Sequence, residues 1–288
     1  MKLVTYQYEG NERVGALTPD GAAILPLPYP DMNTLIESAS FADLLSAASA
    51  AESSGASVPA AEAVLCAPIP RPRQDIICLG MNYRDHLTEA ANYDSAFAKE
   101  RPVTVYFSKR VSQAVAPEGF IERHAGLTER LDYENELAVI LGRTARDVKA
   151  ADAADYIFGY TIVNDVSARE VQTAHKQFYF GKSLDGFTPM GPCIVTADEF
   201  DTYPPALPIR SRVNGKLRQD SNTKLQIFEI DHVIHELSQG MTLKAGTIIA
   251  TGTPAGVGMG MDPPQFLYPG DTVQCEIEGI GTLTNTVR

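Results

Sequence analysis

The sequence lacks the features of a secreted or membrane-spanning chain. None of its apolar runs approaches the roughly 18 residues that a spanning helix needs. The N-terminal stretch "MKLVTYQYEG" alternates like a β-strand and has no apolar core of a signal peptide. The four cysteines are scattered, without the paired spacing of a zinc site, a redox motif or a disulfide framework. We therefore expect a cytoplasmic protein with buried, reduced thiols and no membrane association.

Positive charge is also scarce. The 288 residues include 24 Lys and Arg against 36 Asp and Glu, which gives a formal net charge of −12. Such a chain has no general attraction to phosphate backbones or anionic lipid, so we expect no nucleic-acid partner. With 44% hydrophobic and 21% charged residues, the composition is that of an ordinary globular protein with a substantial core.

Several catalytic motifs are missing. There is no G-x-S-x-G, no Cys close to a His in the sequence and no H-E-x-x-H. The glycine-rich stretch "ATGTPAGVGMGM" lacks the Gly-Lys-Ser/Thr ending of a phosphate loop, and its glycines do not fit dinucleotide spacing. Its free N–H groups and the hydroxyls of Thr251 and Thr253 could still hold a carboxylate. Nucleotide binding is disfavoured.

The hydrophobic pattern predicts a strand-rich chain with two parts. Residues 1–30 read as short strands, and near-helical spacing of apolar residues predicts helix over 31–52. Three prolines near residue 70 form a stiff connector, and we place a domain boundary there. The predicted domains are a small N-terminal one, residues 1–70, and a catalytic one, residues 74–288. Beyond the connector the strands come in runs without regular strand–helix alternation, which predicts a β-rich α+β fold and not a doubly wound sheet.

One predicted strand, "LDYENELAVIL", carries three carboxylates. Asp132, Glu134 and Glu136 alternate with other residues and should share one face of the strand. Like charges on a sheet are destabilising, so a cation is expected in front of them. Glu134 and Glu136, with Asp165 at the end of the strand "GYTIVND", form a set of hard oxygen ligands suited to Mg²⁺, Mn²⁺ or Ca²⁺. The alternative is a solvated strand face or a set of salt bridges.

Two further segments carry candidate catalytic groups. In "GMNYRDHLTEA", His86 and Glu89 are three residues apart, so on a helix they lie on one face and can form a hydrogen bond. Such a pair makes a general base for water, although an ordinary surface pair is the alternative. Lys182, in "FGKSLDGF", could stabilise an anionic substrate or a developing enolate, or be an exposed loop lysine.

The order of these motifs along the chain is more specific than any single motif. "GMNYRDH", "DYENELAVILGR", "FGYTIVNDVSARE", "GKSLDGF" and "GTIIATGTPAGVG" follow one another over residues 74–288, and together they resemble the fumarylacetoacetate hydrolase family. The resemblance implies a mixed β-sheet roll behind a small N-terminal domain, and a homodimer. It also implies Mg²⁺ or Mn²⁺ held by Glu134, Glu136 and Asp165.

The resemblance further implies roles for the remaining candidates. In members with a mobile lid helix, the residues matching His86 and Glu89 form the water-activating dyad. The residues that would line the substrate site are Arg169, Gln172, Lys182 and Thr253. One departure is Glu170, which stands where the family commonly has Asp; the change keeps the charge, so we expect little effect.

The implied substrates are small 2-oxo acids with a second carbonyl or carboxyl group. We predict metal-dependent cleavage of the C3–C4 bond of an acylpyruvate or diketo acid, because His86 and Glu89 can activate water. Decarboxylation of oxaloacetate and isomerisation of an unsaturated oxo-diacid on the same site are the alternatives. A non-catalytic metal-dependent binding protein is disfavoured, because it would be expected to have lost part of the site.

Overall fold

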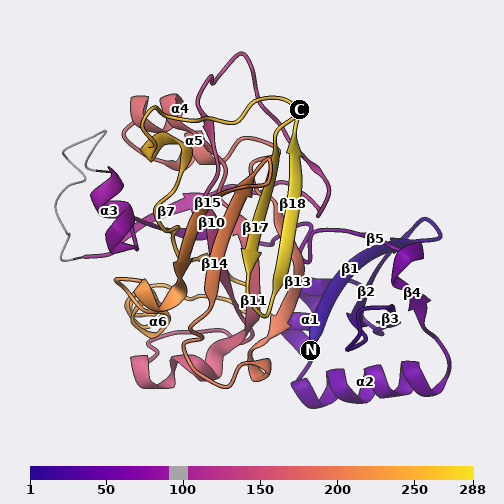
Figure 1. Ribbon diagram of the computed structural model, residues 1–288. Helices are drawn as coiled ribbons and strands as arrows, with labels where there is room; N and C mark the ends of the chain where they lie inside the picture. Colours follow the sequence, from indigo (N-terminus) through magenta and orange to yellow (C-terminus); the bar gives the residue numbers. More distant parts are fainter. Residues whose placement is uncertain (91–102) are drawn as a thin grey trace.

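The computed structural model describes residues 1–90 and 103–288, which form a strand-rich α+β fold as the sequence predicts (Figure 1). Most strands belong to one large sheet with the order β4-β3-β2-β1-β13-β11-β10-β16-β6-β7, and β5 pairs with β1. Its pairs are antiparallel except β16 with β6. The strands are β1 (Lys2–Tyr8), β2 (Asn11–Leu17), β3 (Ala23–Pro26), β4 (Val58–Pro59), β5 (Val64–Leu65), β6 (Ile76–Gly80), β7 (Val105–Lys109), β10 (Asn135–Leu141), β11 (Ile157–Asn164), β13 (Met190–Thr196) and β16 (Ile248–Ala250).

A second sheet packs against the middle of the first. Its order is β15-β14-β17-β18-β8, and its strands are β8 (Phe120–Ile121), β14 (Pro208–Val213), β15 (Lys216–Asn222), β17 (Thr272–Ile277) and β18 (Gly281–Val287). In β14 and β17 every second residue is buried, as expected for a sheet with one face on the core. Every residue of β10 and β11 is buried. These two central strands therefore lie inside the protein on both faces.

The helices are short and lie around the sheets. They are α1 (Met32–Ser38), α2 (Phe41–Ser53), α3 (Arg84–Ala90), α4 (Arg169–Ala174), α5 (Tyr179–Lys182) and α6 (Ile230–Ser238), and a two-stranded ladder joins β9 (Leu131–Asp132) to β12 (Ser167–Ala168). Short 3₁₀ turns cover Ala60–Glu62, Ala150–Tyr156, Ala197–Glu199, Thr223–Leu225 and Gly258–Gly260. No helix in residues 1–90 or 103–288 is long and apolar enough to cross a membrane.

The predicted helix over residues 31–52 is two helices. α1 starts at Asp31, whose carboxylate accepts a hydrogen bond from the N–H of Thr34 at 2.7 Å. It ends at Ser38, with Ala39 as its C-cap, and Ser40 and Asp43 then form a capping box that begins α2. Apolar spacing is similar in both helices, so the pattern alone did not reveal the break.

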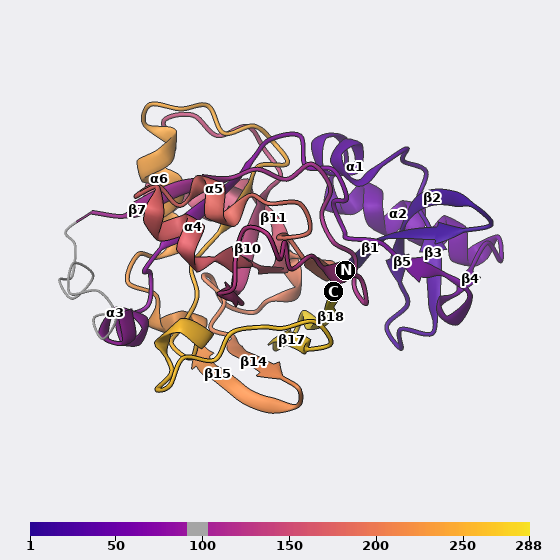
Figure 2. The ribbon, with the colours of Figure 1, turned by 90° about the horizontal axis from the view of Figure 1, so that it is seen from above.

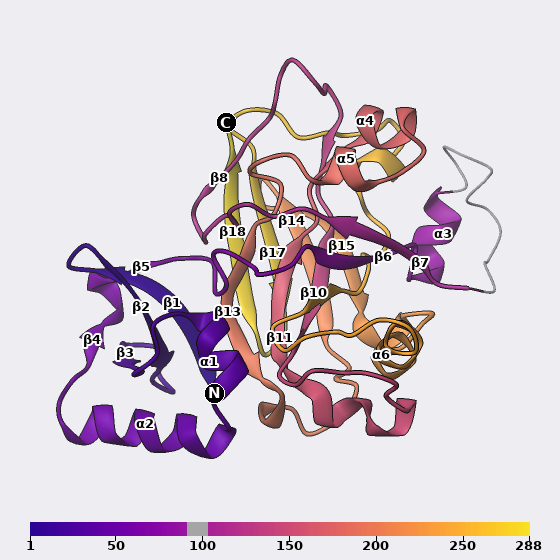
Figure 3. The same ribbon diagram turned by 180° about the vertical axis from the view of Figure 1, so that it is seen from behind.

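The N-terminal segment adds strands to the large sheet. β1 pairs with β13, placing Leu3 opposite Ile194. Figures 1, 2 and 3 agree that β1–β5, α1 and α2 lie at one end of the molecule, and that α3, α4 and α5 lie away from them. The division of the chain between residues 70 and 74 stays a prediction. The candidate site described next involves the part of the chain after residue 74.

Candidate active site

Three buried carboxylates meet where β10 begins and β11 ends. The two strands are antiparallel, and Asn135 lies opposite Asn164. Glu134, Glu136 and Asp165 flank this pair in the sequence, and ligand atoms of all three lie within 4.8 Å of one another. The structure thus brings together the three residues that the sequence predicts as metal ligands, because strand pairing aligns residues about 30 positions apart.

Asp132 does not belong to this cluster. The predicted strand is interrupted, since β9 ends at Asp132 and β10 begins at Asn135. The Asp132 carboxylate accepts hydrogen bonds from the N–H groups of Gly258, at 2.7 Å, and Met259, at 2.9 Å. The expectation that three acids continue along one regular strand is therefore wrong for Asp132, which binds a loop instead.

Buried cations surround the cluster. Lys182 Nζ donates to Glu134 Oε2 at 2.7 Å and to Asp165 Oδ2 at 2.6 Å. Arg169 bridges two acids, with Nη1 2.7 Å from Glu134 Oε1 and Nε 3.0 Å from Asp132 Oδ2. The alternative of an exposed loop lysine is thus wrong for Lys182, because its side chain is buried in α5.

Sequence reasoning missed Lys109. This fully buried residue ends β7, and its Nζ lies 2.7 Å from Asp165 Oδ1 and 3.3 Å from the carbonyl of Val166. A third bond runs to the carbonyl of Lys182. The only signal in the sequence was a lysine at the end of the mostly apolar stretch "VYFSK". That signal does not distinguish a buried lysine from one on the surface.

The electrostatics of the cluster favour a bound cation. Burial would raise the pKa of Glu134, but the charges of Lys182 and Arg169 lower it to about 2. Burial, and then the negative charges of Asp165 and Glu134, raises the pKa of Glu136 well above its usual range. Repulsion among the three carboxylates of Glu134, Glu136 and Asp165 is a cause of this raised pKa, and a bound cation would relieve it. Three carboxylates within reach of one ion are the hard oxygen donors that fit a divalent metal ion such as Mg²⁺ or Mn²⁺.

His86 and Glu89 form a pair on α3. His86 Nδ1 lies 3.0 Å from Glu89 Oε2, and the other carboxylate oxygen, Oε1, accepts the N–H of Gly256 at 3.0 Å. His86 is buried, so the pair is not the ordinary surface pair that the sequence left open. A carboxylate that accepts from Nδ1–H leaves Nε2 as the proton acceptor of a neutral imidazole.

A cavity of about 390 Å³ lies between these groups. Six predicted site residues line it, namely His86, Glu134, Arg169, Gln172, Lys182 and Thr253. Gln172 Oε1 accepts from Arg169 at 3.1 Å. The hydroxyl of Thr253 donates to the carbonyl of Asn135 at 2.9 Å and accepts from Gln219 at 2.7 Å. Gln219, which the sequence did not single out, thus ties the second sheet to the start of β10.

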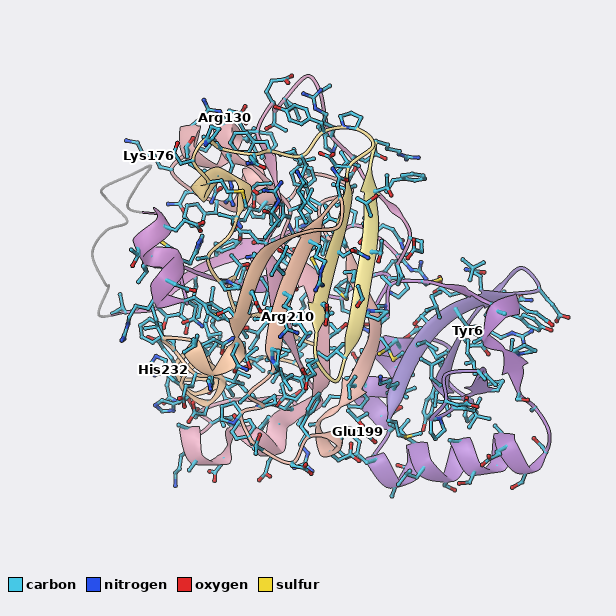
Figure 4. All side chains as sticks on the ribbon, viewed as in Figure 1. Tyr6, Arg130, Lys176, Glu199, Arg210 and His232 are labelled. Atoms are coloured by element: carbon cyan, nitrogen blue, oxygen red, sulfur yellow. The ribbon has the colours of Figure 1, made fainter. Side chains whose placement is uncertain are left out.

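Glu170, where the sequence departs from the family pattern, has defined partners. Its carboxylate accepts from the hydroxyl of Thr128 at 2.5 Å and from the N–H groups of Glu129 and Arg130 at 3.0 and 3.2 Å. Burial would raise the pKa of Glu170, but these hydrogen bonds lower it. Figure 4 shows Arg130 beside α4, at the top of the molecule. Glu170, which lies in α4, therefore holds residues 128–130 against this helix.

The chain has relatives among known protein families and curated proteins. A family model described as the C-terminal part of fumarylacetoacetate hydrolase matches residues 75–288. Among curated relatives, the chain is 46% identical over 226 residues to "Oxaloacetate tautomerase YisK" of Bacillus subtilis, which covers 78% of this chain and 73% of that protein.

Solved structures are similar over the whole chain. A fumarylacetoacetate hydrolase from Exiguobacterium antarcticum is 41% identical, with a TM-score of 0.83, over 100% of this chain and 99% of that one. A 2-hydroxyhepta-2,4-diene-1,7-dioate isomerase from Mycobacterium marinum is 33% identical, with a TM-score of 0.78, over 100% and 98%. These names cover different reactions, so the match to the family does not by itself choose one of them.

Proposed function

Because the chain belongs to the fumarylacetoacetate hydrolase family, we propose that it is a metal-dependent enzyme that interconverts the keto and enol forms of oxaloacetate or a close 2-oxo dicarboxylate. One observation carries the proposal: an acidic cluster and a His–Glu pair with a buried imidazole are combined at a single cavity. The identity to an oxaloacetate tautomerase supports oxaloacetate as the first substrate to test.

The metal would be held by Glu134, Glu136 and Asp165, with Mg²⁺ or Mn²⁺ as the expected ions. Bound there, it would act as a Lewis acid that polarises a 2-oxo group and stabilises enolate charge. Lys182 and Arg169 line the same cavity and would add positive charge beside an anionic substrate. Electrostatic stabilisation of charge that develops during the reaction is often the largest catalytic term.

His86 would be the group that moves the proton. Its neutral Nε2 takes the proton from C3, the C2–C3 double bond forms, and the negative charge passes to the 2-oxygen. The imidazolium then returns this proton to that oxygen, so the enol has the same atoms as the keto acid and nothing is oxidised or reduced. Glu89 keeps the imidazole oriented and stabilises its charged form.

C3–C4 cleavage is the second candidate. The orientation of His86 by Glu89 would equally serve to deprotonate a water that attacks a C4 carbonyl, as the prediction of an acylpyruvate hydrolase requires. The likeness to a fumarylacetoacetate hydrolase supports this class of reaction. Decarboxylation of oxaloacetate would need only the groups that stabilise the enolate charge, and no water attack. The likeness to a dioate isomerase supports a further alternative, proton transfer on a longer diacid.

A three-substrate assay tests the proposal. Purified protein with Mg²⁺ or Mn²⁺ is given oxaloacetate, acetylpyruvate and an unsaturated 2-hydroxy dienedioate. Enol decay is followed by ultraviolet absorbance, CO₂ by a coupled assay, and acetate with pyruvate by chromatography. We expect oxaloacetate enol–keto conversion to be the fastest. Faster release of acetate from acetylpyruvate would replace this proposal with the hydrolase.

The assembly is tested by a separate experiment. We keep the predicted homodimer and cytoplasmic location as proposals, which rest on the family resemblance and on the features of the sequence. Light scattering of the purified protein measures its mass in solution, against 31.2 kDa for one chain. A mass of one chain would contradict the dimer.

A further inference from the structure

The glycine-rich segment Gly256–Gly260 received no role from the sequence beyond a general capacity to bind anions. In the structure its backbone faces two carboxylates of the protein. Gly258 and Met259 donate their N–H groups to Asp132 at 2.7 and 2.9 Å, and Gly256 donates to Glu89 at 3.0 Å. The segment, called here the 256–260 loop, therefore connects Asp132 to the helix that carries His86.

Because residue 260 is glycine, the side chain of Glu89 can occupy the space where a Cβ atom would lie. A Cβ at residue 260 would lie 2.1 Å from Glu89 Cδ and 2.2 Å from Glu89 Oε1, far closer than atoms can approach. The backbone of Gly260 is not left-handed, so its conformation does not itself demand glycine. What demands glycine is the position of Glu89.

The middle of the loop is linked to the acidic cluster through Asp132 and Arg169. Asp132, besides binding the loop, accepts from Arg169 Nε at 3.0 Å, and Arg169 Nη1 lies 2.7 Å from Glu134. All three of these side chains are buried, where charge-assisted hydrogen bonds are strong. A continuous series of contacts thus runs from Glu134 through Arg169, Asp132 and the 256–260 loop to Glu89 and His86.

We propose that the 256–260 loop is a positioning element for the proton-transferring pair. Asp132 fixes the loop, Gly260 admits the Glu89 side chain, and the N–H of Gly256 aims the Glu89 carboxylate at His86. Asp132 and Gly260 are positioning residues, because they act on His86 only through Glu89. This inference rests on the proposed function of His86 and Glu89.

The first test is Gly260→Ala. The added methyl group displaces a side chain on a short helix and not the backbone of the sheets, so the protein should fold. Misplacement of a catalytic group by about 1 Å costs on the order of 10²-fold in rate, so we expect kcat to fall about 10- to 100-fold with little change in KM. Gly240→Ala is the matched control, since a Cβ there meets no atom of the described residues within 4 Å and its backbone is not left-handed.

A double-mutant cycle separates positioning from general damage. In a Glu89→Ala background the methyl group of Ala at residue 260 has no carboxylate to displace, so Gly260→Ala should cause little further loss. Equal losses in both backgrounds would show that the change damages the loop itself and would overturn the proposal. An unchanged kcat in the single variant would overturn it as well.

Hydrogen–deuterium exchange supplies a readout that does not depend on turnover. Gly260→Ala should speed amide exchange in α3, and Asp132→Asn should speed it in both α3 and the loop, because Asn cannot accept from Met259 and Arg169 with its amide nitrogen. Gly240→Ala should change neither. The double-mutant cycle is measured with whichever substrate the wild-type protein converts. If oxaloacetate is not that substrate, the wild-type assay shows it, and the test of the loop is unaffected. Unaltered exchange in both test variants would contradict the positioning role.

Discussion

The acidic cluster and the His86–Glu89 pair are held in different ways. The cluster sits where β10, paired on both sides by β11 and β16, meets the end of β11. The pair sits on a seven-residue helix, and one oxygen of the Glu89 carboxylate is held by the N–H of Gly256 in the 256–260 loop. Strand pairing thus sets the first group through many backbone bonds, whereas the second depends on a few side-chain contacts.

Substitutions in the two regions should therefore impair the enzyme in different ways. A change in the cluster should affect every reaction of the site, because the developing negative charge of each is stabilised there. A change at the pair should affect only the steps that move a proton, and should leave metal binding intact. A substitution in the pair that also weakened metal binding would show that the two regions act as one unit.

The largest effect is expected for Glu134→Ala. The change removes a proposed metal ligand and leaves Lys182 and Arg169 without their shared carboxylate. Because metal assistance contributes several kcal/mol, and 1.36 kcal/mol corresponds to tenfold, we expect turnover to fall by at least about 10³-fold on every substrate. Steady-state assays with calorimetric titration of Mn²⁺ measure the effect. Unchanged turnover would contradict the metal mechanism.

Lys109→Met tests whether the cluster depends on its buried cations for stability. Removing one member of a buried ion pair typically costs about 3–5 kcal/mol, and here Asp165 would keep only Lys182 as a buried cation partner. We expect urea unfolding to show a loss of this size in metal-free protein, and added Mg²⁺ to recover part of it. Arg110→Met is the control, since its pair with Asp75 is exposed. Equal losses in the two variants would contradict the prediction.

His86→Ala tests the pair. General acid–base groups contribute about 10²–10⁴-fold, so enol–keto conversion should slow by at least about 10²-fold while Mn²⁺ affinity stays the same. Acetylpyruvate cleavage should fall in parallel, and oxaloacetate decarboxylation, which needs no water attack, should be spared. Equal loss of all three activities would show that His86 has another role.

The smallest effect is expected for Glu170→Gln. The variant retains one acceptor oxygen in place of two, so a loss of about 1 kcal/mol in the free energy of unfolding is expected. Because the folded protein lowers the pKa of Glu170, the wild-type contribution is fully present above the unfolded value and is lost as pH falls through the folded pKa. The stability difference between wild type and variant should therefore shrink at low pH. A difference that grows in acid would contradict this sign.

The family, the strand-rich fold and the candidates at the cavity could be predicted from residue types and their order. Alternation of acids at the start of a buried strand indicated Glu134 and Glu136, and a three-residue spacing indicated that His86 and Glu89 share a helical face. These signals are local, since they depend on periodicities of two residues in a strand and 3.6 in a helix.

The separate role of Asp132 and the break at Ser40 were not predicted. Asp132 lies in the same alternation as Glu134, but its partners are N–H groups 126 and 127 positions away in the sequence. Ser40 directly follows the C-cap of α1 and begins α2 through a capping box, which the apolar spacing does not reveal. In both cases a polar contact decides the structure at a position where the hydrophobic pattern continues unchanged.

The sequence by itself determined which residues form buried strands, which carry hard oxygen ligands and which family the chain resembles. Only the tertiary structure decided which charges meet. Lys109 reaches Asp165 across 56 positions, and the 256–260 loop reaches Glu89 across 167. The physical reason is that a buried charge needs its partner within hydrogen-bonding distance, and no periodicity of the chain records which distant residue folding will place there.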